Sequence, residues 1–146
     1  MHKPFLIVGF ALLLAAVSCS KPDKNACNGG AASFQMNQPF LLCWGTTATQ
    51  TGDNFSVHFA RLVEESRCPT DVVCVTAGRV LVGLTFTHDG LSKTDTLTLN
   101  DPFGATYTDS TLFQGYKIKL QEVLPVPVST VQTTEEDYKV KLLITN

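Results

Sequence analysis

The sequence predicts an all-β domain built as a sandwich of antiparallel strands, and three observations carry this prediction. Apolar and polar residues alternate in several short segments after residue 34, turn residues separate these segments, and no window there shows helical three-to-four spacing. About seven or eight strands spaced in this way are typical of a β-sandwich or a small barrel. We favour an immunoglobulin-like sandwich over a closed barrel, and we expect residues 34–146 to form it.

Four segments show the alternation most clearly and predict the central strands. They are residues 55–60, 80–87, 116–121 and 138–145. In the last two segments, lysines alternate with aromatic and aliphatic residues, so we expect these lysines on the solvent face of antiparallel strands.

Turn and capping residues predict where the strands end. Turn chemistry occurs at residues 51–54, 88–90, 100–102 and 114–115. Pro125 and Pro127 follow a strong strand, and because proline donates no ladder hydrogen bond, this segment should leave the sheet or run along an edge. One short helical turn is expected near residues 133–137, with Thr134 as its cap.

Length and charge limit the possible functions. The 146 residues have room for one domain. The formal net charge is −2, and removal of residues 1–18, which contain Lys3 and no acid, leaves ten basic and thirteen acidic residues, a net charge of −3. With three arginines and no basic run, the chain is not expected to bind nucleic acid.

The first 18 residues have the pattern of an export signal. Lys3 lies in a short positive segment, and an apolar run follows from Phe5 to Val17. A run of about 13 residues suits a signal peptide and is too short for a spanning helix, which needs about 20. An ordinary signal peptide, cut after the small residues at 15–18, is one interpretation. The other rests on residues 16–19, Ala-Val-Ser-Cys, which resemble the lipobox of bacterial lipoproteins although Ala16 stands where that motif prefers Leu.

The lipobox resemblance implies that Cys19 is acylated and becomes the first residue of the mature chain. Five cysteines are an odd count for an exported protein, and giving Cys19 to the lipid leaves four for two disulfides. Residues 19–33 read as a flexible tether. Because Ser follows Cys19, the chain also resembles lipoproteins sent to the outer membrane, so we expect it in the bacterial cell envelope.

The remaining cysteines are Cys27, Cys43, Cys68 and Cys74, and they allow three disulfide connectivities. Proximity in the sequence favours Cys68 with Cys74 and Cys27 with Cys43. Five residues separate Cys68 from Cys74, more than zinc and redox motifs usually have, and no His lies near them. We therefore expect disulfides and no metal.

A segment around these cysteines resembles a family. Ser66-Arg67-Cys68-Pro69 is followed by Cys74 and by Ala77-Gly78, and Asp137-Tyr138 opens the last predicted strand. Over residues 40–145 the chain resembles small bacterial lipoproteins that have no assigned activity. Those proteins often carry an aromatic residue where this chain has Thr76. The resemblance implies a family and no particular chemistry.

The titratable residues do not form a recognisable catalytic motif. Glu64 and Glu65 are adjacent and should point to opposite faces of a strand, so that Arg67 pairs with one of them. His58 and His88 have no free thiol to activate, and no nucleophile elbow is present, which leaves only a Ser/His/Asp set formed by the fold as an open alternative. We predict that the protein is not an enzyme and has no cofactor.

The predicted function is therefore a lipid-anchored binding domain that presents loops to a protein, a peptide or an envelope polymer. The candidate binding residues are Glu65, Arg67, Pro69 and Asp71. One alternative is an inhibitor of an envelope protease or other enzyme, with the loop from Arg67 to Cys74 entering the active site. A hydrolase is the other alternative.

Overall fold

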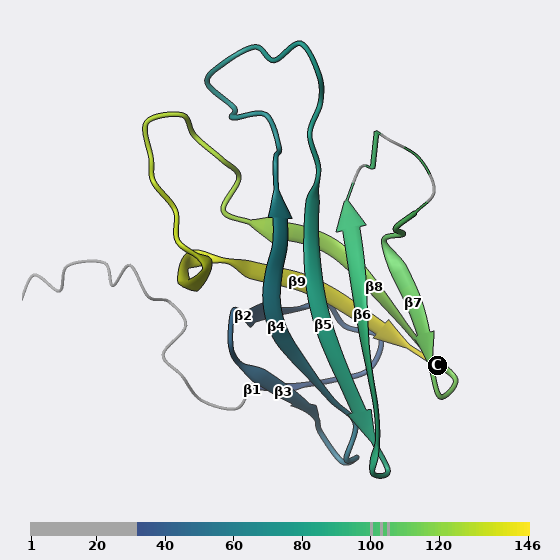
Figure 1. The fold of residues 1–146 in the computed structure, drawn as a ribbon. Helices are drawn as coiled ribbons and strands as arrows, with labels where there is room; N and C mark the ends of the chain where they lie inside the picture. The colour runs from purple at the N-terminus through teal and green to yellow at the C-terminus, as the bar shows by residue number, and fades with distance from the viewer. Residues whose placement is uncertain (1–31, 100, 103, 105) are drawn as a thin grey trace, which may run out of the picture.

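The computed structural model describes residues 32–146, except residues 100, 103 and 105 (Figure 1). The described strands are β1 (Ala32–Phe34), β2 (Phe40–Cys43), β3 (Thr47–Gln50), β4 (Ser56–Glu65), β5 (Val80–His88), β6 (Leu91–Leu99), β7 (Ser110–Phe113), β8 (Tyr116–Leu124) and β9 (Lys139–Thr145). One turn of 3-10 helix, η1 (Glu135–Asp137), precedes β9. The all-β prediction is confirmed. β1 includes residues 32 and 33, the last two of the segment predicted as a tether. Residues 1–31, with the predicted signal and the rest of the tether, lie outside the described part.

Two sheets face each other and enclose the core. The first sheet, here sheet A, has the order β1-β3-β4-β5-β6, and the second, sheet B, has the order β2-β9-β8-β7. All described strand pairs are antiparallel except β1 with β3. Figure 1 shows sheet A crossing in front of sheet B, with the two sheets covering each other. The predicted sandwich is therefore confirmed.

Alternation along the strands explains the core. The fully buried side chains include Val57, Phe59 and Phe86 from sheet A and Ile118 and Leu142 from sheet B. Burial of one such side chain contributes roughly 1.5–3 kcal/mol to stability. The polar positions between them face solvent, as predicted for the lysines of β8 and β9.

The turns predicted at residues 51–54, 88–90 and 114–115 and the cap of η1 are also confirmed, whereas the turn predicted at 100–102 includes a residue outside the described part. Asp89 and Gly90 have φ of 48° and 75°, and Gln114 and Gly115 have φ of 49° and 87°. Positive φ at both residues of a two-residue turn matches the twist of a hairpin, here β5–β6 and β7–β8. At η1, the Asp137 carboxylate accepts hydrogen bonds from the Thr134 amide and hydroxyl, at 2.8 and 3.0 Å.

Candidate functional site

Three long loops leave the sandwich at one end, which we call the loop end (Figure 1). The β4–β5 loop comprises residues 66–79, the β6–β7 loop residues 100–109, and the β8–β9 loop residues 125–138, which include η1. The predicted departure of the chain from the sheet at Pro125 is confirmed, because β8 ends at Leu124. The loop end therefore combines segments that lie far apart in the sequence.

A disulfide closes the tip of the β4–β5 loop, as predicted. Cys68 and Cys74 are joined, with their Cα atoms 5.9 Å apart. Cys43 is also disulfide-bonded, whereas Cys27, its predicted partner, and Cys19 lie outside the described residues. The pairing of Cys27 with Cys43 thus stays a prediction.

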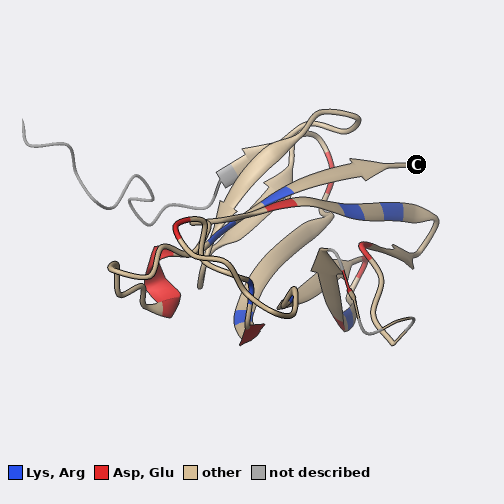
Figure 2. Ribbon diagram, turned by 90° about the horizontal axis from the view of Figure 1, so that it is seen from above, with Lys and Arg blue, Asp and Glu red and all other residues tan. Residues whose placement is uncertain are grey.

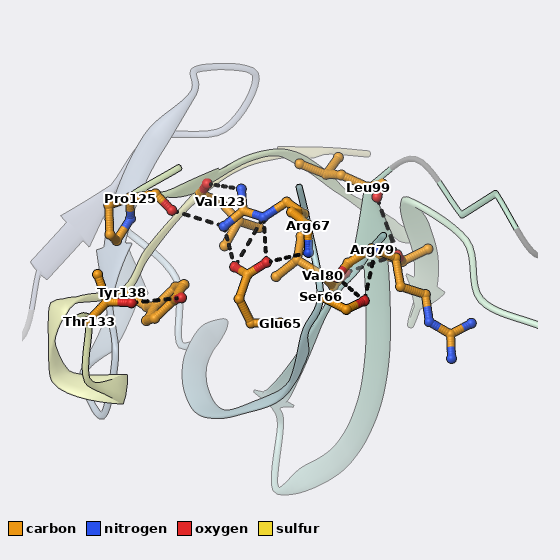
Figure 3. Close-up of polar contacts among 11 residues, drawn as sticks. Glu65, Ser66, Arg67, Arg79, Val80, Leu99, Val123, Pro125, Thr133 and Tyr138 are labelled. Atoms are coloured by element: carbon orange, nitrogen blue, oxygen red, sulfur yellow. Dashed lines mark hydrogen bonds and ion pairs between the residues drawn. The ribbon is translucent and has the colours of Figure 1, made fainter. Parts of the chain in front are cut away.

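Arg67 fastens the base of this loop to sheet B (Figure 3). Its Nε donates to both carboxylate oxygens of Glu65, at 2.8 and 3.0 Å, and Nη2 completes the ion pair. Nη1 donates to the Val123 carbonyl at 2.8 Å, and Nη2 donates to the Pro125 carbonyl at 2.9 Å. Because only 17% of the Arg67 side chain is exposed, these charge-assisted hydrogen bonds are protected from solvent.

Asp71 and Thr70 join the disulfide loop to the β8–β9 loop above Arg67. The Asp71 carboxylate accepts hydrogen bonds from the Ser129 amide at 2.8 Å and the Ser129 hydroxyl at 2.5 Å. The Thr70 amide donates to the Pro127 carbonyl at 3.0 Å. The two Ser129 hydrogen bonds, the hydroxyl's foremost, lower the pKa of Asp71, so its carboxylate stays charged.

Arg79 and Gly78 hold the other side of the loop base. Arg79 forms an ion pair with Glu64 at 3.0 Å, and its guanidinium lies 5.5 Å from the centre of the Tyr107 ring in the β6–β7 loop. The hydrogen bond from Arg79 is the main reason that the pKa of Glu64 is lowered. At Gly78 the backbone approaches the Ser66 carbonyl so closely that a Cβ atom would lie 1.5 Å from its oxygen. Glycine is therefore required there.

The adjacent acids point apart, as the sequence predicts. Glu65 pairs with Arg67 toward sheet B, while Glu64 pairs with Arg79. Register shifts in β4, between Leu62 and Glu64 among others, adjust which way these side chains point. The two carboxylates are thus used by two different arginines.

The tip of the disulfide loop presents apolar side chains to solvent. Val73 and Val75 are fully exposed, and Val72 is 44% exposed. Residues 72–78 contain no charged side chain. The Arg67 and Asp71 contacts hold the base of the loop in place, so the exposed valines project from an ordered segment.

The β8–β9 loop adds a second apolar region and a hollow. Val126 is 44% exposed and Val131 57% exposed. A hollow of about 410 Å³ lies beside this loop, lined by Pro125, Val131, Gln132, Thr133, Asp137 and Lys139. Below it, burial raises the pKa of Tyr138, whose hydroxyl lies 3.3 Å from that of Thr133.

The structure assigns different roles to the predicted binding residues. Glu65 and Arg67 form the ion pair at the base of the β4–β5 loop, Asp71 holds this loop to Ser129, and Pro69 lies within the disulfide ring. Sequence reasoning missed the exposed valines and Ser129 as parts of the loop end. Three valines without alternation, at residues 72, 73 and 75 around Cys74, were the available signal.

His58 and His88 lie away from the loop end (Figure 1). His58 Nδ1 lies 3.2 Å from the Thr47 hydroxyl and 3.0 Å from the Thr46 carbonyl. His88 Nδ1 lies 2.6 Å from the Gln114 side-chain oxygen, and its Nε2 lies 3.4 Å from the Asp53 carboxylate. Among the described residues, neither histidine contacts both a carboxylate and a Ser or Thr hydroxyl.

The Asp53 carboxylate also accepts a hydrogen bond from the Tyr116 hydroxyl at 2.9 Å, so it joins this phenol to His88. The hydrogen bond to Gln114 is the largest cause that raises the pKa of His88, and the carboxylates of Asp89 and Asp53 add to it. This cluster connects three turns at the end of the sandwich opposite the loop end.

In the part of the chain that the structure describes, no three His, Cys, Asp or Glu side chains are grouped to hold a metal ion. The described residues also include no helix with the length and apolarity to cross a membrane. Comparison of the chain with family models, curated proteins and solved structures found no match. The likeness of residues 40–145 to small lipoproteins therefore stays a prediction.

Proposed function

We propose that this protein is a non-catalytic binding module of the bacterial cell envelope that binds a partner protein through its loop end. One observation carries the proposal: the disulfide loop holds Val73 and Val75 fully exposed on a base ordered by Arg67 and Asp71. Exposed apolar side chains gain free energy when another surface covers them. A loop that is ordered before binding also loses less conformational entropy.

The chemistry of the tip favours a protein partner over an envelope polysaccharide. Residues 72–78 offer apolar surface and no charge, which suits an apolar cleft on another protein. Removal of one valine side chain from water contributes roughly 1.5–3 kcal/mol, so two buried valines would supply a substantial part of the affinity.

The location at the cell envelope in this proposal is inferred from the sequence. Removal of residues 1–18 and acylation of Cys19 would hold the domain at the envelope, with the outer membrane as the expected site. Mass spectrometry of the native protein tests this part directly. An unmodified thiol at Cys19 would refute the lipid anchor and leave the loop-end proposal to be tested separately.

The binding test is partner capture from the envelope of the source cells with three versions of the full chain. The wild type should retain one or more specific proteins, and Val73→Asp/Val75→Asp should lose them because charges would enter the apolar contact. Leu91→Asp is the matched control, because Leu91 is 61% exposed at the opposite end of the sandwich. Equal capture by the wild type and the double variant would refute the role of the loop end.

A second candidate is an enzyme inhibitor, and the projecting disulfide loop supports it. Since Arg67 lies below the loop, the residues that would enter an active site are Val72 to Val75, not Arg67. Inhibition assays with an envelope-protease panel test this candidate. Inhibition by the wild type that Val73→Asp abolishes would support it, and Arg67→Ala should weaken inhibition only through loss of loop order. No inhibition by the wild type would end this proposal.

A further inference from the structure

The outer face of sheet B carries four lysines. Lys117 and Lys119 on β8 and Lys139 and Lys141 on β9 occupy the same face of the sheet at successive places along it. The register places Lys117 opposite Thr145 and Lys119 opposite Leu143, whereas Lys141 lies opposite Glu122 and Lys139 opposite Leu124. We call these four lysines, with Leu143 and Thr145, the lysine face. In Figure 2, blue bands lie along the strands next to the chain end, with a red band beside one of them, whereas η1 is red.

Most of these lysines have no acidic partner. Lys119 lies 3.6 Å from Asp109, whereas Lys117, Lys139 and Lys141 form no ion pair among the residues that the structure describes. Elsewhere, Arg67 and Lys93 each form one ion pair and Arg79 forms two. Glu122 lies opposite Lys141 in the register and lowers the charge of the face without removing it.

Apolar residues accompany the lysines on the same surface. Leu112, opposite Lys117 on β7, is 67% exposed, and Leu41, opposite Lys141 on β2, is 51% exposed. A shallow hollow of about 140 Å³ lies between Lys117, Lys119, Leu143 and Thr145. Positive charge at the centre and exposed leucines at both edges are the combination that favours adsorption to an anionic lipid interface.

We propose that the lysine face binds the anionic phospholipid headgroups of the membrane. The inference rests on the lipid anchor of the proposed function, which would make even weak binding effective. Residues 20–31 separate Cys19 from Ala32, and about 12 residues span at most about 40 Å. A tether this short keeps the face at high effective concentration near the lipid. The mature chain is negatively charged overall, so an anionic membrane repels its other surfaces. The lysine face is therefore the side that turns toward the lipid in this proposal.

Vesicle flotation of the mature chain with Cys19→Ala tests the face without any acyl group. The probes are phosphatidylcholine vesicles with and without phosphatidylglycerol. We expect binding only to the anionic vesicles, weakened by added salt because salt screens the charges. Lys117→Gln/Lys141→Gln should weaken this binding about tenfold or more.

The matched control is Arg61→Gln/Lys93→Gln, which removes the same charge from other surfaces. Arg61 lies across Gly83 on sheet A. Lys93, on β6 of the same sheet, donates to Thr111 and Leu112 of β7, and its charge is already balanced by Asp95. This control should change binding less than about twofold, because these charges do not face the lipid in the proposed orientation. Unchanged unfolding curves should show that both double variants are folded.

Three outcomes would overturn the proposal. They are equal binding to neutral and anionic vesicles, equal weakening by the two double variants, and tighter, lysine-dependent binding to a soluble acidic polysaccharide such as heparin than to vesicles. The loop variant Val73→Asp/Val75→Asp should leave vesicle binding unchanged. The vesicle assay therefore tests membrane binding by the lysine face separately from partner binding by the loop end.

Discussion

Replacement of Arg67 by methionine should destabilise the domain strongly, because one side chain joins the β4–β5 loop to sheet B. Methionine keeps a long apolar stem but removes the donors to Glu65, Val123 and Pro125. Removing one member of a buried ion pair typically costs about 3–5 kcal/mol. Since Arg67 and Glu65 remain 17% and 16% exposed and water could reach the freed groups, we expect about 2–4 kcal/mol.

Urea unfolding of the disulfide-intact chain measures this loss. The companion variants are Glu65→Gln and the double variant Glu65→Gln/Arg67→Met. The double variant should be more stable than the sum of the two single losses, with a coupling of about 1–3 kcal/mol, because the second change no longer leaves a buried charge unpaired. A loss below about 0.5 kcal/mol for Arg67→Met is the range of ordinary surface changes. Such a result would refute the claim that the Arg67 contacts stabilise the domain.

Three further predictions concern the rest of the chain. Gly78→Ala should lower the unfolding free energy by more than about 1 kcal/mol, because its Cβ would lie 1.5 Å from a backbone oxygen; wild-type stability in thermal unfolding would contradict the observed close approach. The pKa of His88 is raised above 6.5, first by the hydrogen bond to Gln114. Protonated His88 should therefore stabilise the fold fully below pH 6.5, and this contribution should disappear as the pH rises through the folded-state pKa. Urea unfolding across this range should show the unfolding free energy falling with pH, and His88→Gln should remove that dependence. Cys68→Ala/Cys74→Ala should cost about 2 kcal/mol by the loop-closure estimate, and equal denaturant midpoints with and without the disulfide would contradict it.

Local patterns in the sequence predicted the elements whose own residues determine them. Lys117 and Lys119 alternate with Ile118 and Leu120, and the structure buries the second pair and exposes the first. Thr134 ahead of an acidic run predicted the cap of η1. β1 and β3 have three and four residues, which is too short for alternation to be recognised.

The candidate site was only partly predictable, because its geometry depends on contacts between distant segments. The sequence suggested that Arg67 pairs with a neighbouring acid, but not that it reaches Val123 and Pro125. Likewise, nothing in the sequence near Asp71 points to Ser129. Such contacts separated by more than fifty residues arise only after the two sheets pack.

By itself, the sequence determined the all-β class, the positions of the main strands and which strand positions face solvent, and it favoured the Cys68–Cys74 disulfide, which the structure contains. These properties follow from the two-residue period of a strand and from cysteines close together in the chain. Only the tertiary structure decided the strand order of the two sheets, the gathering of three loops at one end and the alignment of the lysines of β8 and β9 on one face. The physical reason is that strand pairing and sheet packing are set by burial of the whole core, which no single segment contains.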